Sequence, residues 1–265
     1  MWPSPALKRT FYCCTPTQLL LCSQRSPHSM GGQHHEEDSE GVSAPWNYTV
    51  VHFTQSRNLA HILGDCDGIF SRHRLRASDL PHNPTDPDRW DGCEDLVCCS
   101  LEYPNVYYFA RVREQDHLFK DWVVLMIKPD FLWMPGTKFC PTNAATARGA
   151  YIGEGYDAFI SLFADTAPGI SFSRPAGHLP CAPTNIQAEV LVPDPIPIDD
   201  ITAIAVADED QARREICCAS LQGLSIDKDI LVVPDFYQRQ RLARTIQRGN
   251  RVNEIIFDNG GDHGQ

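Results

Sequence analysis

The sequence predicts an α+β domain in which short strands are joined by loops and a few longer helices. Short apolar runs rich in β-branched residues, clearest at 122–127, have the length and composition of buried strands. A longer segment, 208–219, predicts a helix between two such runs. The chain has 265 residues, 42% of them hydrophobic, which is enough for a sizeable core in one large domain or two small ones.

The two ends of the chain differ from its middle. Residues 1–45 are rich in Pro, Ser, Gln, His and Gly and show no hydrophobic periodicity, which argues against packed structure. We therefore expect a disordered or non-native tail over 1–45, a single domain over 46–257 and a frayed tail over 258–265. Met30 offers an alternative start of the chain.

The folded part is expected to begin with a strand over 48–54 and a short helix. Ser56 is the predicted N-cap of this helix, and Gly64 ends it. His52 and Thr54 then share one face at the end of the strand, beside the start of the helix, where an anion or a ribose can bind. A purely structural role for His52 is the alternative.

A long polar loop is predicted over 72–95, and loops of this length are usually functional or disordered. Within it, Arg89 stands next to Trp90, a pair that can clamp a phosphate or stack on a base. A solvent-exposed arginine is the alternative.

Strands dominate the prediction for the rest of the middle. The segment 139–146 predicts a loop that enters a short helix, and a Pro- and Gly-rich region follows over 164–184. The predicted strands lie at 96–102, 106–112, 122–127, 201–206 and 230–233.

One further strand, over 185–193, carries the most informative polar residues. Val190 to Val192 are apolar, and Pro193 ends the run. Because side chains alternate along a strand, Gln187 and Glu189 point to the same side. A carboxylate at the mouth of an apolar strand is costly to desolvate unless it is used, and the amide beside it offers a donor and an acceptor. An edge strand with a solvated polar face is the alternative.

The last predicted helix spans about 235–248 and carries Arg241, Arg244 and Arg248 on one face. The chain as a whole has a formal net charge of −11, so any binding of nucleic acid must use a local basic patch of this kind. A solvated helix face is the alternative.

The eleven cysteines include three adjacent pairs, and neighbouring cysteines point apart. We expect reduced thiols in a cytoplasmic protein. Zinc binding by Cys93, Cys98 and Cys99 is the alternative, but they lack a paired C-x-x-C arrangement, so no metal site is predicted. No apolar run approaches the roughly 20 residues of a membrane span.

Three stretches, in this order, resemble the DarT family of NAD-dependent ADP-ribosyltransferases that modify DNA bases. The first is His52-Phe53-Thr54 with the segments 58–63 and 68–71, the second is 139–146 with its Asn143-Ala144-Ala145 core, and the third is 187–193. The resemblance covers about residues 46–206 and leaves out the last helix.

The resemblance implies an ADP-ribosyltransferase fold, which is a split, mostly antiparallel β core with flanking helices and NAD in the cleft. It implies that Glu189 is the catalytic glutamate and that His52 and Thr54 hold NAD. Residues in matching segments are further candidates for NAD binding, and Arg89 falls where the family has an arginine that contacts NAD. These further candidates are Asn58, Ser71, Arg89 and Asn143.

The residue chemistry agrees with that resemblance. Glu189 can stabilise the oxocarbenium ion that forms when nicotinamide leaves, Gln187 can orient the acceptor, and Arg89 can neutralise the diphosphate. The expected function is mono-ADP-ribosylation of a base in single-stranded DNA, by a monomeric toxin with a cognate antitoxin in a toxin–antitoxin or phage-defence pair. The same chemistry on RNA and a non-catalytic module that binds NAD or a partner remain alternatives, and the modified base stays open.

Overall fold

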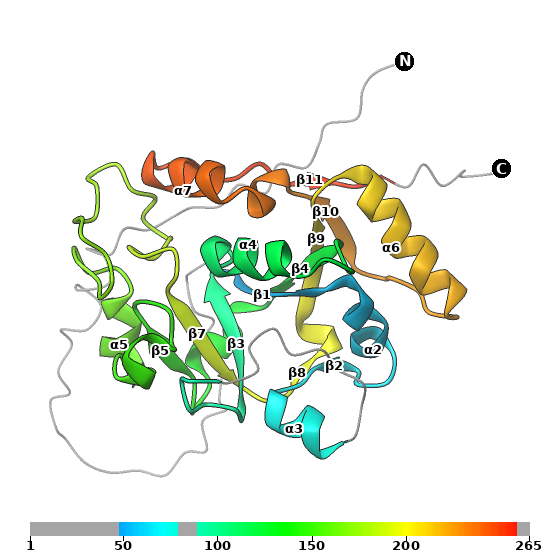
Figure 1. The fold of residues 1–265 in the computed structure, drawn as a ribbon, viewed down its shortest axis with the longest axis horizontal. Coiled ribbons are helices and arrows are strands. Elements are labelled where there is room, and N and C mark those ends of the chain that lie inside the picture. The colour runs from blue at the N-terminus through cyan, green and yellow to red at the C-terminus, as the bar shows by residue number, and fades with distance from the viewer. Residues whose placement is uncertain (1–47, 79–88, 259–265) are drawn as a thin grey trace, which may run out of the picture. The chain divides into compact units, whose positions relative to one another are not determined.

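The computed structural model describes residues 48–78 and 89–258, and within them nine strands form one mixed, mostly antiparallel sheet (Figure 1). Its order is β11-β10-β9-β4-β1-β3-β7-β5-β6, and only β9 and β10 pair in parallel. These strands are β1 (Val50–Gln55), β3 (Leu96–Leu101), β4 (Trp122–Ile127), β5 (Lys138–Cys140), β6 (Gly153–Glu154), β7 (Glu189–Pro193), β9 (Ile201–Val206), β10 (Asp229–Val232) and β11 (Ile255–Ile256). A separate pair joins β2 (Gly68–Ile69) to β8 (Ile196–Pro197).

Helices pack around this sheet, and the predicted α+β class is confirmed. The α-helices are α2 (Leu59–Leu63), α3 (Arg72–Ala77), α4 (Val106–Gln115), α5 (Gly155–Ser161), α6 (Glu209–Leu221) and α7 (Arg239–Gln247). Short 3₁₀ turns are η1 (Ser56–Asn58), η2 (Pro129–Trp133), η3 (Thr146–Gly149), η4 (Ile198–Asp200) and η5 (Pro234–Tyr237). Among the described residues, no helix combines the length and the apolarity needed to cross a membrane.

The sheet splits between β1 and β3, and this split creates the space for a site. β1 pairs with β4 along all six of its residues, but it pairs with β3 only at Val50↔Leu101 and Val51↔Ser100. Beyond Val51 the two strands diverge. The central strand β4 is buried at every position, since the sheet is covered on both faces there. The expected split β core is therefore present.

One predicted strand is wrong, because 106–112 lies within the helix α4. The apolar residues of this segment have helical spacing, since Val106, Phe109 and Ala110 are buried three and four residues apart. Asn105 caps the helix, and its Oδ1 accepts from the Tyr108 N–H at 3.2 Å. The aromatic run that suggested a strand instead packs Phe109 on Phe53 of β1, with ring centroids 4.6 Å apart.

Other boundaries also differ from the prediction. The segment 72–77, expected as loop, is helix α3, capped by Ser71. Ser56 is not an N-cap, because the chain turns through 3₁₀ geometry first and its hydroxyl donates to Glu215. The last helix starts at Arg239 rather than 235, after η5.

The remaining predictions for these elements hold. Gly64 ends the first helix, and the helix expected over 208–219 is α6, capped by Asp208. The segment 139–146 combines the end of β5, a loop and the start of η3. The strands predicted at 48–54, 96–102, 122–127, 201–206 and 230–233 are confirmed. The strand predicted over 185–193 begins only at Glu189, because 185–187 forms a turn, so Gln187 lies before the strand. The tails expected over 1–45 and beyond Asp258 lie outside the described residues.

Candidate active site

A cavity of about 890 Å³ opens where β1 and β3 diverge. β1 contributes Val51, His52 and Phe53 to its wall, and β3 contributes Cys98 to Ser100. Glu189, the first residue of β7, lies in the wall together with Gln187. Two predicted site residues far apart in the sequence, His52 and Glu189, therefore meet in one cavity.

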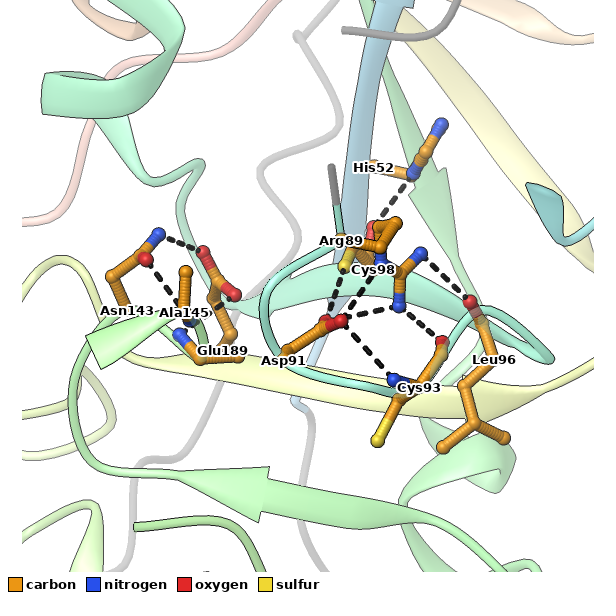
Figure 2. A network of polar contacts seen from close by, with 10 residues as sticks. His52, Arg89, Asp91, Cys93, Leu96, Cys98, Asn143, Ala145 and Glu189 are labelled. Carbon is orange, nitrogen blue, oxygen red and sulfur yellow. Dashed lines mark hydrogen bonds and ion pairs between the residues drawn. The ribbon is translucent and has the colours of Figure 1, made fainter. Parts of the chain in front are cut away.

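The buried carboxylate of Glu189 accepts three hydrogen bonds. Its Oε1 accepts from Asn143 Nδ2 at 2.7 Å and from Asn105 Nδ2 at 3.1 Å, and its Oε2 accepts from the Ala144 N–H at 3.1 Å. Figure 2 shows the Asn143 side of this arrangement. Both oxygens act as acceptors, so the set of donors matches an ionised carboxylate.

Local backbone structure fixes these donors. Asn105 uses Oδ1 to cap α4, which leaves its Nδ2 pointing at Glu189. Asn143 uses Oδ1 to accept from the Ala145 N–H at 3.1 Å, and this turn presents both its own amide and the Ala144 N–H. Neither amide can rotate without losing its backbone partner, so the carboxylate is held in one orientation.

Burial raises the pKa of Glu189 to about 7, and the hydrogen bonds from Ala144 and Asn105 limit the rise. Asp91 raises this pKa further, and Arg89 lowers it. A carboxyl group with a pKa near neutrality can both stabilise a cation and take a proton at neutral pH.

His52 is oriented by the opposite strand. Its Nδ1 lies 2.8 Å from the Cys98 carbonyl oxygen, and because a carbonyl only accepts, Nδ1 carries the proton. Burial lowers the pKa of His52, so the ring is neutral near pH 7. In Figure 2 its Nε2 points away from Cys98, and there it can accept a hydrogen bond from a ligand hydroxyl.

The structure does not place Arg89 in the cavity wall. Its guanidinium is buried, donates to the Leu96 carbonyl oxygen at 3.2 Å and to the Cys93 carbonyl, and pairs with Asp91 at 3.0 Å (Figure 2). Arg89 thus organises the segment 89–96, and Asp91 and Cys98 of that network reach the cavity.

Three other predicted NAD ligands also lie outside the cavity wall. Thr54 is buried, and its Oγ1 accepts from Asn58 Nδ2 at 2.9 Å. Ser71 caps α3, and its N–H donates to Asp194 Oδ1 at 2.7 Å. The hydrogen bonds of these residues stabilise the turns that follow β1 and β2, and their polar groups are used within the protein.

A second hollow, of about 650 Å³, runs along α7 and contains Arg241, Arg244 and Arg248. All three side chains are exposed, as expected of a helix face that binds nucleic acid, and we call this face the basic stripe of α7. Arg241 differs from the other two because its Nε lies 2.6 Å from Asp235 Oδ1.

Sequence reasoning missed Asn105, which holds both the helix α4 and the catalytic candidate Glu189. A signal for it was present, since an asparagine directly before a run with helical spacing is typical of an N-cap. The strand expected over 106–112 concealed this signal.

A family model described as "ssDNA thymidine ADP-ribosyltransferase, DarT" matches residues 51–238. Thermosipho africanus DarTG in complex with ADP-ribose aligns with a TM-score of 0.51 and 15% identity over 71% of this chain and 50% of that chain, so this chain spans half of its length. A comparison with curated proteins found no match.

Thermus sp. 2.9 DarT gives a similar result in two complexes. The complex with NAD+ has a TM-score of 0.50, 15% identity, and coverage of 71% of this chain and 96% of that chain. The complex with ADP-ribosylated ssDNA has a TM-score of 0.50, 12% identity, and coverage of 71% and 95%. At these identities the solved structures establish a shared fold.

Proposed function

Because this chain belongs to the DarT family of NAD+-dependent ADP-ribosyltransferases, we propose that it transfers ADP-ribose from NAD+ to a thymine base of single-stranded DNA with Glu189 as the catalytic residue. The family description supports the choice of thymine, which the sequence alone left open. The observation that carries the proposal is the Glu189 carboxylate, which lies buried in the cavity at the split of the sheet under three N–H donors.

The first step breaks the glycosidic bond between nicotinamide and the ribose of NAD+. Nicotinamide leaves with the bonding electron pair, and positive charge develops on the ribose as an oxocarbenium ion. The fixed carboxylate of Glu189 stabilises this cation at short range, in surroundings of low dielectric constant.

The second step forms the bond to the base. A ring nitrogen of thymine attacks the anomeric carbon of the ribose, and its proton passes to Glu189, whose pKa of about 7 suits it to this role. Gln187 lies in the same cavity wall and orients the base through its side-chain amide. Its backbone N–H donates to Asn185 Oδ1 at 3.0 Å, which fixes its position relative to Glu189.

In this proposal His52 and Asn143 contact NAD+ directly, since both line the cavity. Arg89 acts through the loop that it holds rather than by touching the diphosphate, since its guanidinium is engaged by Asp91 and two carbonyls. Thr54 and Asn58 stabilise the turn after β1 through their mutual hydrogen bond, and Ser71 stabilises the turn after β2 through its bond to Asp194.

The DNA strand meets the protein at the predicted basic face of α7, where we place phosphates against Arg244 and Arg248, while the third predicted arginine, Arg241, is paired with Asp235. An acidic chain needs such a local patch, because the overall net charge of −11 repels a polyanion.

Mass spectrometry of oligonucleotides incubated with the protein and NAD+ tests this function. We expect an added ADP-ribose on thymine-containing single-stranded DNA and none with Glu189→Gln. Modification of RNA alone would replace DNA by RNA as the substrate. NAD+ hydrolysis without transfer to any strand would contradict the proposal.

We also propose that the chain acts in the cytoplasm as the toxin of a toxin–antitoxin or phage-defence pair, restrained by a cognate antitoxin. The eight described cysteines are all free thiols, which suits a reducing compartment. Controlled expression in bacteria should stop growth with the wild-type chain and not with Glu189→Gln. Equal growth in both strains would remove the toxin role and leave the enzymatic proposal intact.

A further inference from the structure

The cavity beside Glu189 and the hollow along α7 share one residue, Arg239. Arg239 is exposed and is the first residue of α7. It also lies directly after the last residue that the family model matches, so the family match says nothing about its role. The two hollows therefore meet at a cation.

The segment around Arg239 is the most basic stretch of this acidic chain. Between Asp235 and Glu254 it holds five arginines and no acidic residue. Arg241 is paired with Asp235 at 2.6 Å, and Arg251 is paired with Glu102 at 3.6 Å.

The other three arginines are Arg239, Arg244 and Arg248, and within the described part of the chain none of them has an acidic partner. They are the arginines of α7 and its C-terminal cap that are available to phosphate groups. From Arg239 to Arg248 the helix rises by about 13.5 Å, so these side chains can contact successive phosphates of one strand.

Helix α4 forms the wall of the cavity next to Arg239 and adds an aromatic surface there. It packs against α7 and η5, and Arg113 Nη1 donates to the Tyr237 carbonyl oxygen at 3.1 Å, two residues before Arg239. Tyr107 of α4 lines the cavity with 41% of its surface exposed. Exposed rings of this kind are stacking platforms for unpaired bases.

We propose that one single-stranded DNA follows α7 and enters the catalytic cavity at Arg239. Its phosphates contact Arg248, Arg244 and then Arg239, and the nucleotide beyond Arg239 turns its base past Tyr107 toward Glu189. Arg239 thus binds the phosphate next to the target nucleotide and couples the grip on the strand to the presentation of the base. This path rests on the proposed function, because it needs a nucleic-acid acceptor.

Substrates of two lengths separate Arg239 from the rest of the stripe. A trinucleotide reaches only the cavity and its mouth, whereas an oligonucleotide of about 15 nucleotides also covers α7. Arg239→Gln should lower kcat/KM for transfer to both substrates by about tenfold, the effect of losing one charge-assisted hydrogen bond. Arg244→Gln and Arg248→Gln should lower transfer to the long substrate more than to the trinucleotide.

Matched controls complete the experiment. Arg213→Gln removes the same charge from α6, where the side chain pairs with Glu209 and Asp210, and it should leave both rates unchanged. Arg239→Lys should recover part of the loss, since it keeps the charge but not the guanidinium fork.

If Arg239→Gln matches Arg213→Gln on both substrates while the wild-type protein modifies DNA, the path is refuted and the proposed function stands. If the wild-type protein modifies no strand, the proposed function fails, and equal binding of labelled single-stranded DNA by Arg239→Gln and Arg213→Gln then refutes the path as well.

Discussion

The two regions that the proposal joins are built in opposite ways. The Glu189 carboxylate is buried, and each of its oxygens already has a donor. Along α7 the charges are several and exposed, and within the described ranges 48–78 and 89–258 only Arg241 among the three predicted arginines has an acidic partner. The first region suits chemistry, which needs a preorganised charge, and the second suits a mobile polyanion, which needs many weak contacts. The effect of a single substitution should therefore be large in the first region and small in the second.

The largest effect is expected from Glu189→Gln. Removal of the charge that faces the oxocarbenium ion should lower transfer on the order of 10²–10³-fold or more. One N–H donor will then face an amide nitrogen, at a cost of about 1–3 kcal/mol in stability, so thermal unfolding must be measured beside turnover. Near-normal turnover of the folded variant would end the assignment of Glu189.

The pH dependence tests the same carboxylate without a mutation. The pKa of Glu189 is raised to about 7, so the carboxyl is protonated below that pH and ionised above it. If the ionised form is the active one, kcat/KM for NAD+ should fall about tenfold per pH unit below 7 and level off above it. A flat profile between about pH 5 and pH 8, a range that brackets the pKa of Glu189, would contradict this role if the chain is shown to stay folded throughout.

Asn105→Ser should sharpen the comparison, because it separates the cap of α4 from the bond to Glu189. Serine caps helices about as well as asparagine, but it lacks the Nδ2 that donates to the carboxylate. Loss of this donor raises the pKa of Glu189 further, so the pH profile should shift upward. At neutral pH the rate should drop by about tenfold and recover at higher pH. A loss that is equal at every pH would mean that Asn105 has a structural role alone.

The difference between the regions also explains what the sequence could predict. The run 190–193 is short and apolar, so the strand β7 follows from local pattern. Gln187 and Glu189 line one cavity as expected, but the turn before β7 brings Gln187 there and not the alternation of a strand. The family resemblance over 46–206 is confirmed by the match over 51–238, as is the ADP-ribosyltransferase fold.

What the sequence could not predict depends on tertiary contacts. Whether Arg89 faces a ligand or its own loop is decided by the carbonyls of Cys93 and Leu96, which the fold brings to it. The role of Asn105 requires that the start of α4 lie beside β7, a contact across 84 positions of the chain. The junction at Arg239 likewise exists only once α4 and α7 pack together.

The smallest expected effect belongs to the stripe itself, and it concerns the salt dependence of binding. Each phosphate contact contributes about −0.7 to the slope of log K against log salt for a single strand. Replacement of Arg241, Arg244 and Arg248 by Gln removes three charges, but Arg241 is already paired with Asp235. We therefore expect the slope to flatten by about 1.4, as for two contacts, rather than by about 2.1.

Fluorescence anisotropy with a labelled strand across a salt series measures this slope, with Arg213→Gln and Arg214→Gln together as the control on α6. A change of about 2.1 would show that DNA opens the pair with Asp235. No change would leave α7 as a solvated face and place the grip on the strand elsewhere.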